Sequence, residues 1–437
     1  MLRRQSILLV LALGFLAACS GDPYSRDNGE QDNTYTPSEK PETPEDPPVT
    51  PPNPGGEDPQ DPAGFETAAE AVVNMGAGWN LGNTLDSNSG SKDNMWIEAW
   101  TPRTPTDYET AWGQPVTTRA LIHMFKAAGF KAIRVPVTWY PHMGMIFLYE
   151  DTKWNTSARS GTNVDPTRMA RVKEVVDYVI DEGMYCILNV HHDTGDTGED
   201  HRGAAWLAAD RFDEGKDRYE ALWKQIAETF KDYGPRLLFE SYNEMLDSWN
   251  SWCFASYASP AHYDAAGARA AYDGINNYAR LFVETVRATG GNNAERNLVV
   301  NTYGACSGDG NWNPHLTEPL ANMQIPEKPG HIAVQVHSYW DSGKFSDAQK
   351  KEIDQLYANL DTYLVQRLGV PVIIGEWGGG VGYDTDKNKE FARYFTRKAR
   401  EAGVATFMWM GLSDGEDRSV PTWTMPGTKS AILSSYQ

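Results

Sequence analysis

The stretch Leu237-Leu-Phe-Glu-Ser-Tyr-Asn-Glu244 is a short apolar run that ends in two polar residues. A run of this length between turn signals is typical of a buried β-strand, and the polar residues mark the point where the strand ends. Seven similar runs occur elsewhere in the chain. The eight predicted strands are residues 77–83, 132–139, 185–191, 237–243, 298–304, 332–338, 370–376 and 404–410.

Stretches with helical periodicity separate most of these runs, and several stop at a glycine, as helices often do. The predicted helices are residues 117–128, 166–181, 218–230, 268–288, 346–367 and 385–402, whereas residues 311–329 are loop-like. Alternating strands and helices imply a parallel sheet, and eight such units predict one α/β domain, a (β/α)₈ TIM barrel. An open doubly wound sheet is the alternative, but no glycine-rich phosphate fingerprint follows the first strand.

Composition and charge narrow the class of partner. The chain has 437 residues, of which 40% are apolar, and its formal net charge is −20. Proteins that bind nucleic acid need a basic surface, so this charge argues against a nucleic-acid partner and favours a neutral one. The 15 tryptophans and 21 tyrosines supply flat amphipathic rings that suit the faces of sugars, although most of them are expected in the core.

The first residues resemble a secretion signal. Arg3 and Arg4 precede an apolar run over residues 7–18, which is too short to span a bilayer. The run ends in Leu16-Ala-Ala-Cys19, which resembles a bacterial lipobox and implies cleavage before Cys19 and lipidation of its thiol. The alternative is an ordinary cleavage site with an incidental cysteine. No other segment approaches the length of a transmembrane helix.

Residues 20–64 are rich in proline and hold 11 Asp and Glu residues against two basic ones. Such a segment has too little apolar surface to fold and is extended by its prolines and like charges. We therefore expect a signal peptide at 1–18, a lipid-anchored disordered tether at 19–64 and a catalytic domain at 65–437. The expected location is the outer membrane of a bacterium, at the cell surface, with the periplasmic face as the alternative.

If the thiol of Cys19 carries the lipid, three cysteines remain. Three is an odd number, so the chain has no full disulfide framework. Cys186 lies in an apolar strand and is expected to be a buried thiol. A bridge between Cys253 and Cys306 is left open.

Polar residues end several of the predicted strands, and barrel enzymes carry their chemistry where strands end. Glu244 and Glu376 end two different strands, which favours a glycosidase pair in which one acid protonates the leaving oxygen and the other attacks the anomeric carbon. The alternative is two Glu–Arg ion pairs that hold the rim. The other polar and aromatic residues at strand ends are Arg134, His191, His192, Asn243, His337, Tyr339, Trp340 and Trp409.

These neighbours fit definite roles in such a site. Asn243 is placed to bond the sugar 2-hydroxyl, and Trp409 to form the floor under a pyranose ring. Tyr339 and Arg134 are candidates to orient and charge-stabilise the attacking carboxylate. His337 is expected to bond the acid/base or a sugar hydroxyl. A deeper carboxylate, Glu240, is expected to be hydrogen-bonded inside the barrel.

The order of these motifs resembles glycoside hydrolase family 5, from about residue 70 to about residue 415. The matching motifs are Arg134-Val-Pro-Val, Asn189-Val-His191-His192, Asn243-Glu244, His337-Ser-Tyr339 and Glu376-Trp377, and the opening Gly78-Trp-Asn-Leu-Gly-Asn-Thr-Leu-Asp86 is similar to the bacterial endoglucanase branch. The resemblance implies a retaining mechanism with Glu244 as acid/base and Glu376 as nucleophile. It also implies active-site roles for Arg134, His191, Asn243, His337, Tyr339 and Trp409.

Two departures from the family pattern affect only the local path of the chain. Met245 stands where many members have proline after the acid/base, and the segment between Leu246 and Tyr263 is long and contains Trp249 and Trp252. The sequence therefore leaves the structure of the cleft wall undetermined, whereas the expected mechanism is not affected.

Other residues give weaker signals. His192, Trp340, Asn83 and Asp86 are candidate substrate-binding residues, with turn capping as the alternative for Asn83 and Asp86. The segment 191–201 has the residue types of a metal site, but adjacent histidines on a strand point to opposite sides, so a hydrophilic loop is expected. No metal or cofactor is predicted. Weaker candidates for sugar contact are Trp139, Trp249, Trp252 and Trp312.

The function predicted from these residues is an endo-β-1,4-glucanase that degrades cellulose-like or mixed-linkage β-glucan. Xyloglucan and β-mannan are the alternative substrates within the same chemistry. A hypothesis from a different class is a non-catalytic, glycan-binding surface lipoprotein, which would need no carboxylate pair. The expected partner is a β-glucan polysaccharide or oligosaccharide, the expected membrane contact is the lipid anchor alone, and the expected state is a monomer.

Overall fold

The computed structural model of this chain describes residues 65–87, 108–143, 149–150, 153–154, 161–195, 206–259, 262–327, 329–379 and 383–436. The predicted signal peptide and tether lie outside the described residues. Residues 196–201, which belong to the predicted hydrophilic loop 191–201, also lie outside the described residues.

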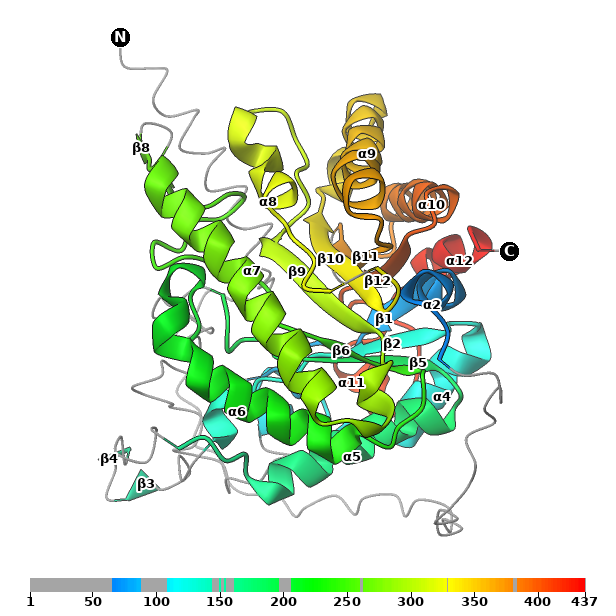
Figure 1. Ribbon diagram of the computed structural model, residues 1–437. Helices are drawn as coiled ribbons and strands as arrows, with labels where there is room; N and C mark the ends of the chain where they lie inside the picture. The colour runs from blue at the N-terminus through cyan, green and yellow to red at the C-terminus, as the bar shows by residue number, and fades with distance from the viewer. Residues whose placement is uncertain are drawn as a thin grey trace, which may run out of the picture. The chain divides into compact units, whose positions relative to one another are not determined.

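Eight parallel strands close into a barrel in the order β1-β12-β11-β10-β9-β6-β5-β2, and helices surround it (Figure 1). Each predicted strand is confirmed, although several are shorter than the apolar runs because the chain leaves the sheet before the run ends. The barrel strands are β1 (Ala77–Asn80), β2 (Ala132–Val135), β5 (Tyr185–Asn189), β6 (Leu237–Glu240), β9 (Leu298–Cys306), β10 (Ile332–Tyr339), β11 (Val372–Gly378) and β12 (Ala405–Met408).

The helices that follow the strands confirm the predicted periodicity. They are α4 (Arg119–Ala128), α5 (Pro166–Asp181), α6 (Phe212–Phe230), α7 (Ala265–Ala288), α9 (Asp347–Leu360) and α10 (Asp386–Glu401). Helix α9 continues as a π-helical turn, Asp361–Gln366. In the described part of the loop-like segment 311–329, the only helices are the short helix α8 (Glu318–Ala321) and a 3₁₀ turn, Pro314–Thr317.

Three helices and two hairpins were not predicted from the sequence, because each is short. The helices are α2 (Ala68–Met75), α11 (Glu416–Ser419) and α12 (Pro426–Ser434), and the hairpins pair β3 (Tyr149–Glu150) with β4 (Lys153–Trp154) and β7 (Tyr257–Ser259) with β8 (His262–Tyr263). Among the described residues, no helix combines the length and the apolar character that crossing a bilayer requires.

Helix α2 closes the end of the barrel at which the strands begin. A capping box starts it, in which the Thr67 hydroxyl accepts from the Glu70 N–H and the Glu70 carboxylate accepts from the Thr67 N–H. Its apolar face packs on the inward-facing side chains of the strands. This lower core contains Ala68, Ala71, Val72, Met75, Ala132, Tyr185, Ile187, Leu238, Val299, Ala333, Ile373, Ala405 and Phe407.

Two residues further along six of the eight strands, the inward positions become polar. Side chains on one face of a strand recur every second residue, so the layer above the apolar core is set by the same alternation. Its members are Asn80, Arg134, Asn189, Glu240, Asn301 and Gln335, all fully buried. The barrel therefore has an apolar lower core and a polar upper core directly beneath its C-terminal rim.

A β-bulge at Gly375 changes which side chain of β11 faces inward. Val336 pairs with Ile374, but the next residue, His337, pairs with Glu376, so Gly375 is an extra residue in β11. Under regular alternation Glu376 would share the outward face of Ile374. The bulge reverses this and brings Glu376 to the barrel mouth.

We predict that Gly375→Ala destabilises the protein by about 1–3 kcal/mol, the usual range for forcing an extra group into a packed core. A Cβ at this position would lie 2.1 Å from Cδ of Gln335, which is fully buried. Urea unfolding should show a lower midpoint for Gly375→Ala, and Gln335→Ala in the same chain should restore part of the loss. Equal midpoints for Gly375→Ala and the wild type would contradict this packing.

Candidate active site

Arg134 is the centre of the polar upper core. Its Nε and Nη2 donate to the two oxygens of Glu240, at 2.6 and 2.7 Å. Nη1 donates to Glu376 Oε1 at 2.7 Å and to Asn80 Oδ1 at 2.9 Å, and Nη2 donates to Asn243 Oδ1 at 2.8 Å. All five N–H groups of the guanidinium therefore have an acceptor.

Glu240 is the deep carboxylate expected from the sequence, and this prediction is confirmed. Burial raises its pKa, but the charge and hydrogen bonds of Arg134 outweigh burial, so the net pKa lies below the ordinary value. Asn189 and Asn301 also donate to its Oε1, at 3.1 and 3.2 Å. Neither asparagine received a role from the sequence, although both occupy inward positions of their strands.

Glu376 lies at the end of β11 and is 4% exposed. Arg134 donates to its Oε1, and the Tyr339 hydroxyl donates to its Oε2 at 2.6 Å. Burial, together with the charges of Glu376 and Glu244, raises the pKa of Tyr339 well above its usual value. The phenol therefore stays protonated and remains a donor to Glu376, as the sequence predicted.

Glu244 lies across the barrel mouth from Glu376. The strand β6 ends at Glu240, so Glu244 belongs to the following loop and not to the strand end where the sequence placed it. Its Oε1 lies 2.9 Å from Nδ1 of His337. One carboxylate oxygen from each of Glu244 and Glu376 and a ring nitrogen of His337 all lie within 4.8 Å of one another.

The hydrogen bonds of Asn189 define the tautomer of His191. The Val137 N–H donates to Oδ1 of Asn189 at 3.1 Å, so Nδ2 is its donor end. This Nδ2 lies 3.0 Å from Nδ1 of His191, which must then be the acceptor nitrogen. The proton of a neutral His191 therefore sits on Nε2, and this atom lies 3.8 Å from Oε1 of Glu376.

Trp409 lies beside His191 at the end of β12. The two rings are almost parallel, with an angle of 4° and centroids 5.7 Å apart. Gly82 packs against the indole, where a Cβ would lie 2.8 Å from a ring carbon. Trp409 is thus held at the barrel mouth between His191 and Gly82, and its role as the floor under a sugar ring stays a prediction.

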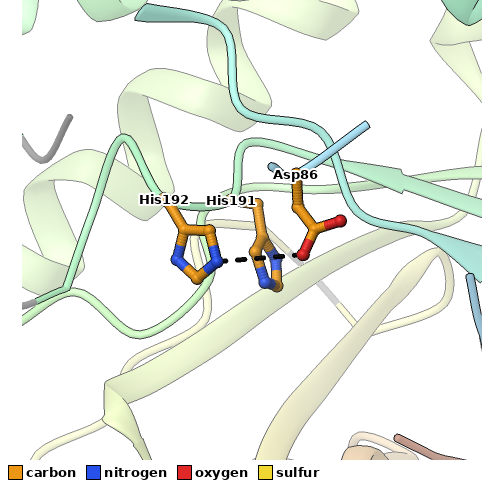
Figure 2. A group of neighbouring side chains, drawn as sticks. All are labelled: Asp86, His191 and His192. Atoms are coloured by element: carbon orange, nitrogen blue, oxygen red, sulfur yellow. Dashed lines mark ion pairs between the residues drawn. The ribbon is translucent and has the colours of Figure 1, made fainter. Parts of the chain in front are cut away.

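His191 and His192 do not point to opposite sides, and the prediction that they would is wrong. Strand β5 ends at Asn189, so strand alternation does not apply to them, and their ring centroids are 4.4 Å apart. Figure 2 shows both rings beside Asp86, with Nε2 of His192 3.8 Å from Oδ2 of that carboxylate. His192 is also within ring contact of Trp112, at 5.2 Å.

For Asp86 the structure favours turn capping over sugar contact. Asp86 is fully buried, and its oxygens accept from the backbone N–H groups of Asn83 and Thr84, at 3.1 and 2.8 Å. Asn83 has a positive φ of 58°, so this turn needs the stabilisation. Burial raises the pKa of Asp86 to about 6, although both backbone donors oppose the shift.

The remaining tryptophan candidates divide by exposure. Trp139 is fully buried and donates to the Asn189 carbonyl, so it is a core residue. Trp340 is half-buried at the end of β10, and its indole N–H donates to Oγ of Ser338 at 2.9 Å. Trp249 and Trp312 are exposed, at 65% and 46%.

Two groups of described residues have the donor types of a metal site: Asp86 with His191 and His192, and Glu244 with His337 and Glu376. In the first group, both oxygens of Asp86 accept backbone N–H groups. In the second, both oxygens of Glu376 accept from Arg134 and Tyr339. These carboxylates are thus already engaged in hydrogen bonds, and the second group is the carboxylate pair itself.

The cysteines carry no bridge among the described residues. Cys186 is a buried thiol, as expected, and Cys253 and Cys306 form no disulfide with each other. Burial raises the pKa of Cys253 to about 12, so it stays a thiol near neutral pH.

A (β/α)₈ barrel with two facing glutamates at the C-terminal rim, one held by an arginine and a tyrosine and the other by a histidine, defines a glycoside hydrolase of the carboxylate-pair class. Comparison with known proteins agrees. Residues 97–414 match the family model described as Cellulase (glycosyl hydrolase family 5). The chain belongs to glycosyl hydrolase family 5 and is an enzyme.

Relatives place the chain close to one branch of this family. Endoglucanase A of Clostridium longisporum is 31% identical over 398 residues, which cover 86% of this chain and 67% of that protein. A solved GH5-4 broad specificity endoglucanase from an uncultured bacterium is 48% identical, with a TM-score of 0.75, over 85% of this chain and 97% of that one.

A third relative was solved in complex with an oligosaccharide. A family 5 glycoside hydrolase of Prevotella bryantii, in complex with a xyloglucan tetradecasaccharide, is 36% identical with a TM-score of 0.70. The match covers 85% of this chain and 99% of that one.

We predict that Tyr339→Phe lowers kcat/KM by about 10–100-fold, because one preorganised donor to Glu376 is lost. The fold should be little affected, since Arg134 still bonds Glu376 and no buried donor is left unpaired. Steady-state kinetics and a thermal melt measure the two effects. A large fall in melting temperature with unchanged kinetics would contradict this role and make Tyr339 a structural residue.

Proposed function

We propose that this protein is a retaining endo-β-1,4-glucanase that cleaves cellulose-like and mixed-linkage β-glucans and also accepts xyloglucan. The observation that carries the proposal is the closeness of Glu244 and Glu376, whose nearest oxygens lie within 4.8 Å. Retaining enzymes hold their carboxyl groups about 5–5.5 Å apart, whereas inverting enzymes need about 6.5–9.5 Å to fit a water between acid and base.

Glu376 is the nucleophile in this proposal. Donors to both of its oxygens, Arg134 and Tyr339, stabilise a carboxylate anion and hold it in one orientation. The ionised oxygen attacks the anomeric carbon of the sugar, the glycosidic bond breaks, and an ester joins the sugar to Glu376.

Glu244 is the acid/base. It gives its proton to the glycosidic oxygen as that oxygen leaves, and then takes a proton from the water that attacks the glycosyl ester and frees Glu376. His337 lies against Oε1 of Glu244 and holds the carboxyl in place. A glycan-binding protein without catalysis would need neither carboxylate, and this chain keeps both with their donors.

Asn243 and Trp409 bind the sugar at the point of cleavage. Arg134 occupies Oδ1 of Asn243, so the amide nitrogen is the end that serves as donor. A donor at this place bonds the sugar 2-hydroxyl, a contact that strengthens in the transition state. Trp409, parallel to His191, provides a flat apolar face for the pyranose ring.

Substrate breadth is proposed from the relatives. The solved relative that is 48% identical is a broad specificity endoglucanase, and the Prevotella bryantii relative binds a xyloglucan tetradecasaccharide. Reducing-sugar release from carboxymethylcellulose, barley β-glucan, xyloglucan and β-mannan ranks these substrates directly. We expect carboxymethylcellulose, barley β-glucan and xyloglucan to be cleaved. Cleavage of β-mannan in their place would favour the alternative, an endo-β-mannanase.

The stereochemical outcome tests the mechanism. Proton NMR of a fresh cello-oligosaccharide digest should show the β-anomer of the new reducing end first, before mutarotation. Glu376→Gln should lose nearly all activity. An initial α-anomer signal would exclude the retaining mechanism and the role of Glu376.

A leaving group that needs no proton tests Glu244. We expect Glu244→Ala to lose activity on glucan but to keep the first step on aryl cellobiosides with good leaving groups, because these require little protonation. Added azide should then trap the intermediate as a β-glycosyl azide, detected by mass spectrometry. Full activity of Glu244→Ala on glucan would remove it from this role.

We also propose that the enzyme is exported and anchored by a lipid on Cys19, with residues 19–64 as the tether to the catalytic domain. The support is the lipobox-like sequence at 16–19 and the acidic, proline-rich segment that follows. This arrangement would place the enzyme on the outer membrane, where a polysaccharide can reach it.

We predict that Cys19→Ala releases the protein from membranes and leaves its specific activity intact, because the anchor lies outside the catalytic domain. Fractionation of cells with a salt wash, followed by an activity assay of each fraction, measures both effects. Retention of the variant in the washed membranes would show that the anchor lies elsewhere.

A further inference from the structure

We propose that Gln335 is a positioning residue for the acid/base. Its amide fixes which ring nitrogen of His337 carries the proton, and through His337 it keeps the acid proton of Glu244 on Oε2, away from the histidine. This inference rests on the proposed function and adds a residue to it. Gln335 lies two residues before His337 on β10 and received no role from the sequence.

The side chain of Gln335 is enclosed by the barrel. It is fully buried, and its amide packs directly on the backbone of β11. A Cβ added to Gly375 would lie 2.1, 2.4 and 2.5 Å from Cδ, Oε1 and Nε2 of Gln335, so the amide fills the space that a side chain at this position would take. The bulge that turns Glu376 inward therefore also makes room for this amide.

Stability does not account for an amide at this place. Among the described residues, no group donates to the buried Oε1 of Gln335. A buried acceptor without a donor is unfavourable, and an apolar side chain of similar length, such as methionine, would avoid the loss. The nitrogen end of the amide does have a partner, because Nε2 of Gln335 lies 3.4 Å from Nε2 of His337.

The amide nitrogen of Gln335 determines the tautomer of His337. An amide nitrogen only donates, so Nε2 of the ring is the acceptor, and the proton of a neutral His337 sits on Nδ1. The other side of the ring agrees. Nδ1 lies 2.9 Å from Oε1 of Glu244 and 3.6 Å from Oε2 of Glu376, and ionised carboxylates only accept.

The same arrangement occurs a second time in the barrel. Asn189 lies two residues before His191, and its amide nitrogen donates to Nδ1 of that ring. The proton of His191 is then on Nε2, 3.8 Å from Oε1 of Glu376. In both pairs a buried amide of the polar upper core donates to one ring nitrogen, so that the other ring nitrogen carries a proton toward a catalytic carboxylate.

The tautomer of His337 decides where Glu244 holds its proton. When Nδ1–H donates to Oε1, that oxygen is the carbonyl oxygen of the protonated carboxyl group, and the acid proton is on Oε2. From Oε2 the proton passes to the glycosidic oxygen, which also keeps the electron pair of the bond that breaks. With the proton of His337 on Nε2 instead, the bare Nδ1 would accept the carboxyl proton at Oε1 and draw it away from the leaving oxygen.

The first test follows the proton directly by NMR. Ring nitrogens with and without a proton have well-separated ¹⁵N shifts, so full-length protein labelled with ¹⁵N in its histidine rings reports the tautomer. A His337→Asn variant identifies the signals of His337. We expect the wild type to carry the proton on Nδ1, and Gln335→Met, which has no amide nitrogen, to show a share of the form protonated on Nε2.

The second test compares two leaving groups, since kcat/KM reports the step that breaks the glycosidic bond. The sugar that leaves from cellohexaose needs a proton, whereas the phenol that leaves from 2-chloro-4-nitrophenyl β-cellotrioside needs little. For Gln335→Met we expect the ratio of kcat/KM for cellohexaose to that for the aryl cellotrioside to fall by about tenfold, the effect of one lost hydrogen bond on an equilibrium. The thermal midpoint should stay at or above the wild-type value, because the unpaired Oε1 is removed as well.

Two further variants control for structure. Gln335→Leu removes the same donor with a different shape and should give the same changes in tautomer and ratio. Asn276 is a buried amide of α7 that donates to the Asn322 carbonyl and accepts from the Gln324 N–H. Asn276→Leu should therefore lower the thermal midpoint and leave the ratio at the wild-type value.

Several outcomes would overturn this role of Gln335. A proton on Nε2 of His337 in the wild type would mean that the amide accepts from the ring, and an equal loss of kcat/KM on both substrates would make Gln335 a packing residue. An unchanged tautomer with an unchanged ratio in both Gln335 variants would mean that the amide positions nothing. If the wild type cleaves neither substrate but Gln335→Met still moves the proton of His337, the proposed function fails and the contact between the two residues stands.

Discussion

The five hydrogen bonds of the Arg134 guanidinium are the interaction on which the rest of the site depends. A buried charge is costly unless it is paired and fully hydrogen-bonded, and Arg134 meets this condition only if acceptors from several strands converge on it. Glu240 supplies two of them, and Glu376, Asn243 and Asn80 supply one each. One residue thus links Glu376, Asn243 and the deep carboxylate Glu240 in a single layer.

The barrel beneath this layer stabilises the buried charged and polar side chains, whose burial is otherwise unfavourable. Helix α2 and the apolar lower core exclude water from one end, and the closed sheet leaves no strand edge open. Because the polar side chains stand on short, mutually paired strands, they can move little relative to one another. Preorganised donors are the largest source of transition-state stabilisation in many enzymes, and here the scaffold itself supplies the preorganisation.

The loops above the strands are joined by contacts of their own. The segment after β6 is bound to strand β9 through Asp247 and Tyr303, and to the segment after β9 through Tyr263 and Glu318. These contacts leave the carboxylate pair untouched and instead shape the rim around it. In barrel enzymes the loops can change while the layer beneath them stays the same, so one scaffold supports different sites.

The sequence alone determined the eight strands, six of the helices, and the identity of Glu244, Glu376, Arg134 and Tyr339 as site residues, because periodicity and strand-end polarity are local properties. It did not determine how the side chains meet. Regular alternation would turn Glu376 outward, and only the bulge at Gly375 against β10 brings it inward. Likewise, the turn of His191 and His192 to one side follows from the end of strand β5 at Asn189. Those features depend on contacts between segments far apart in the chain, and no local pattern encodes them.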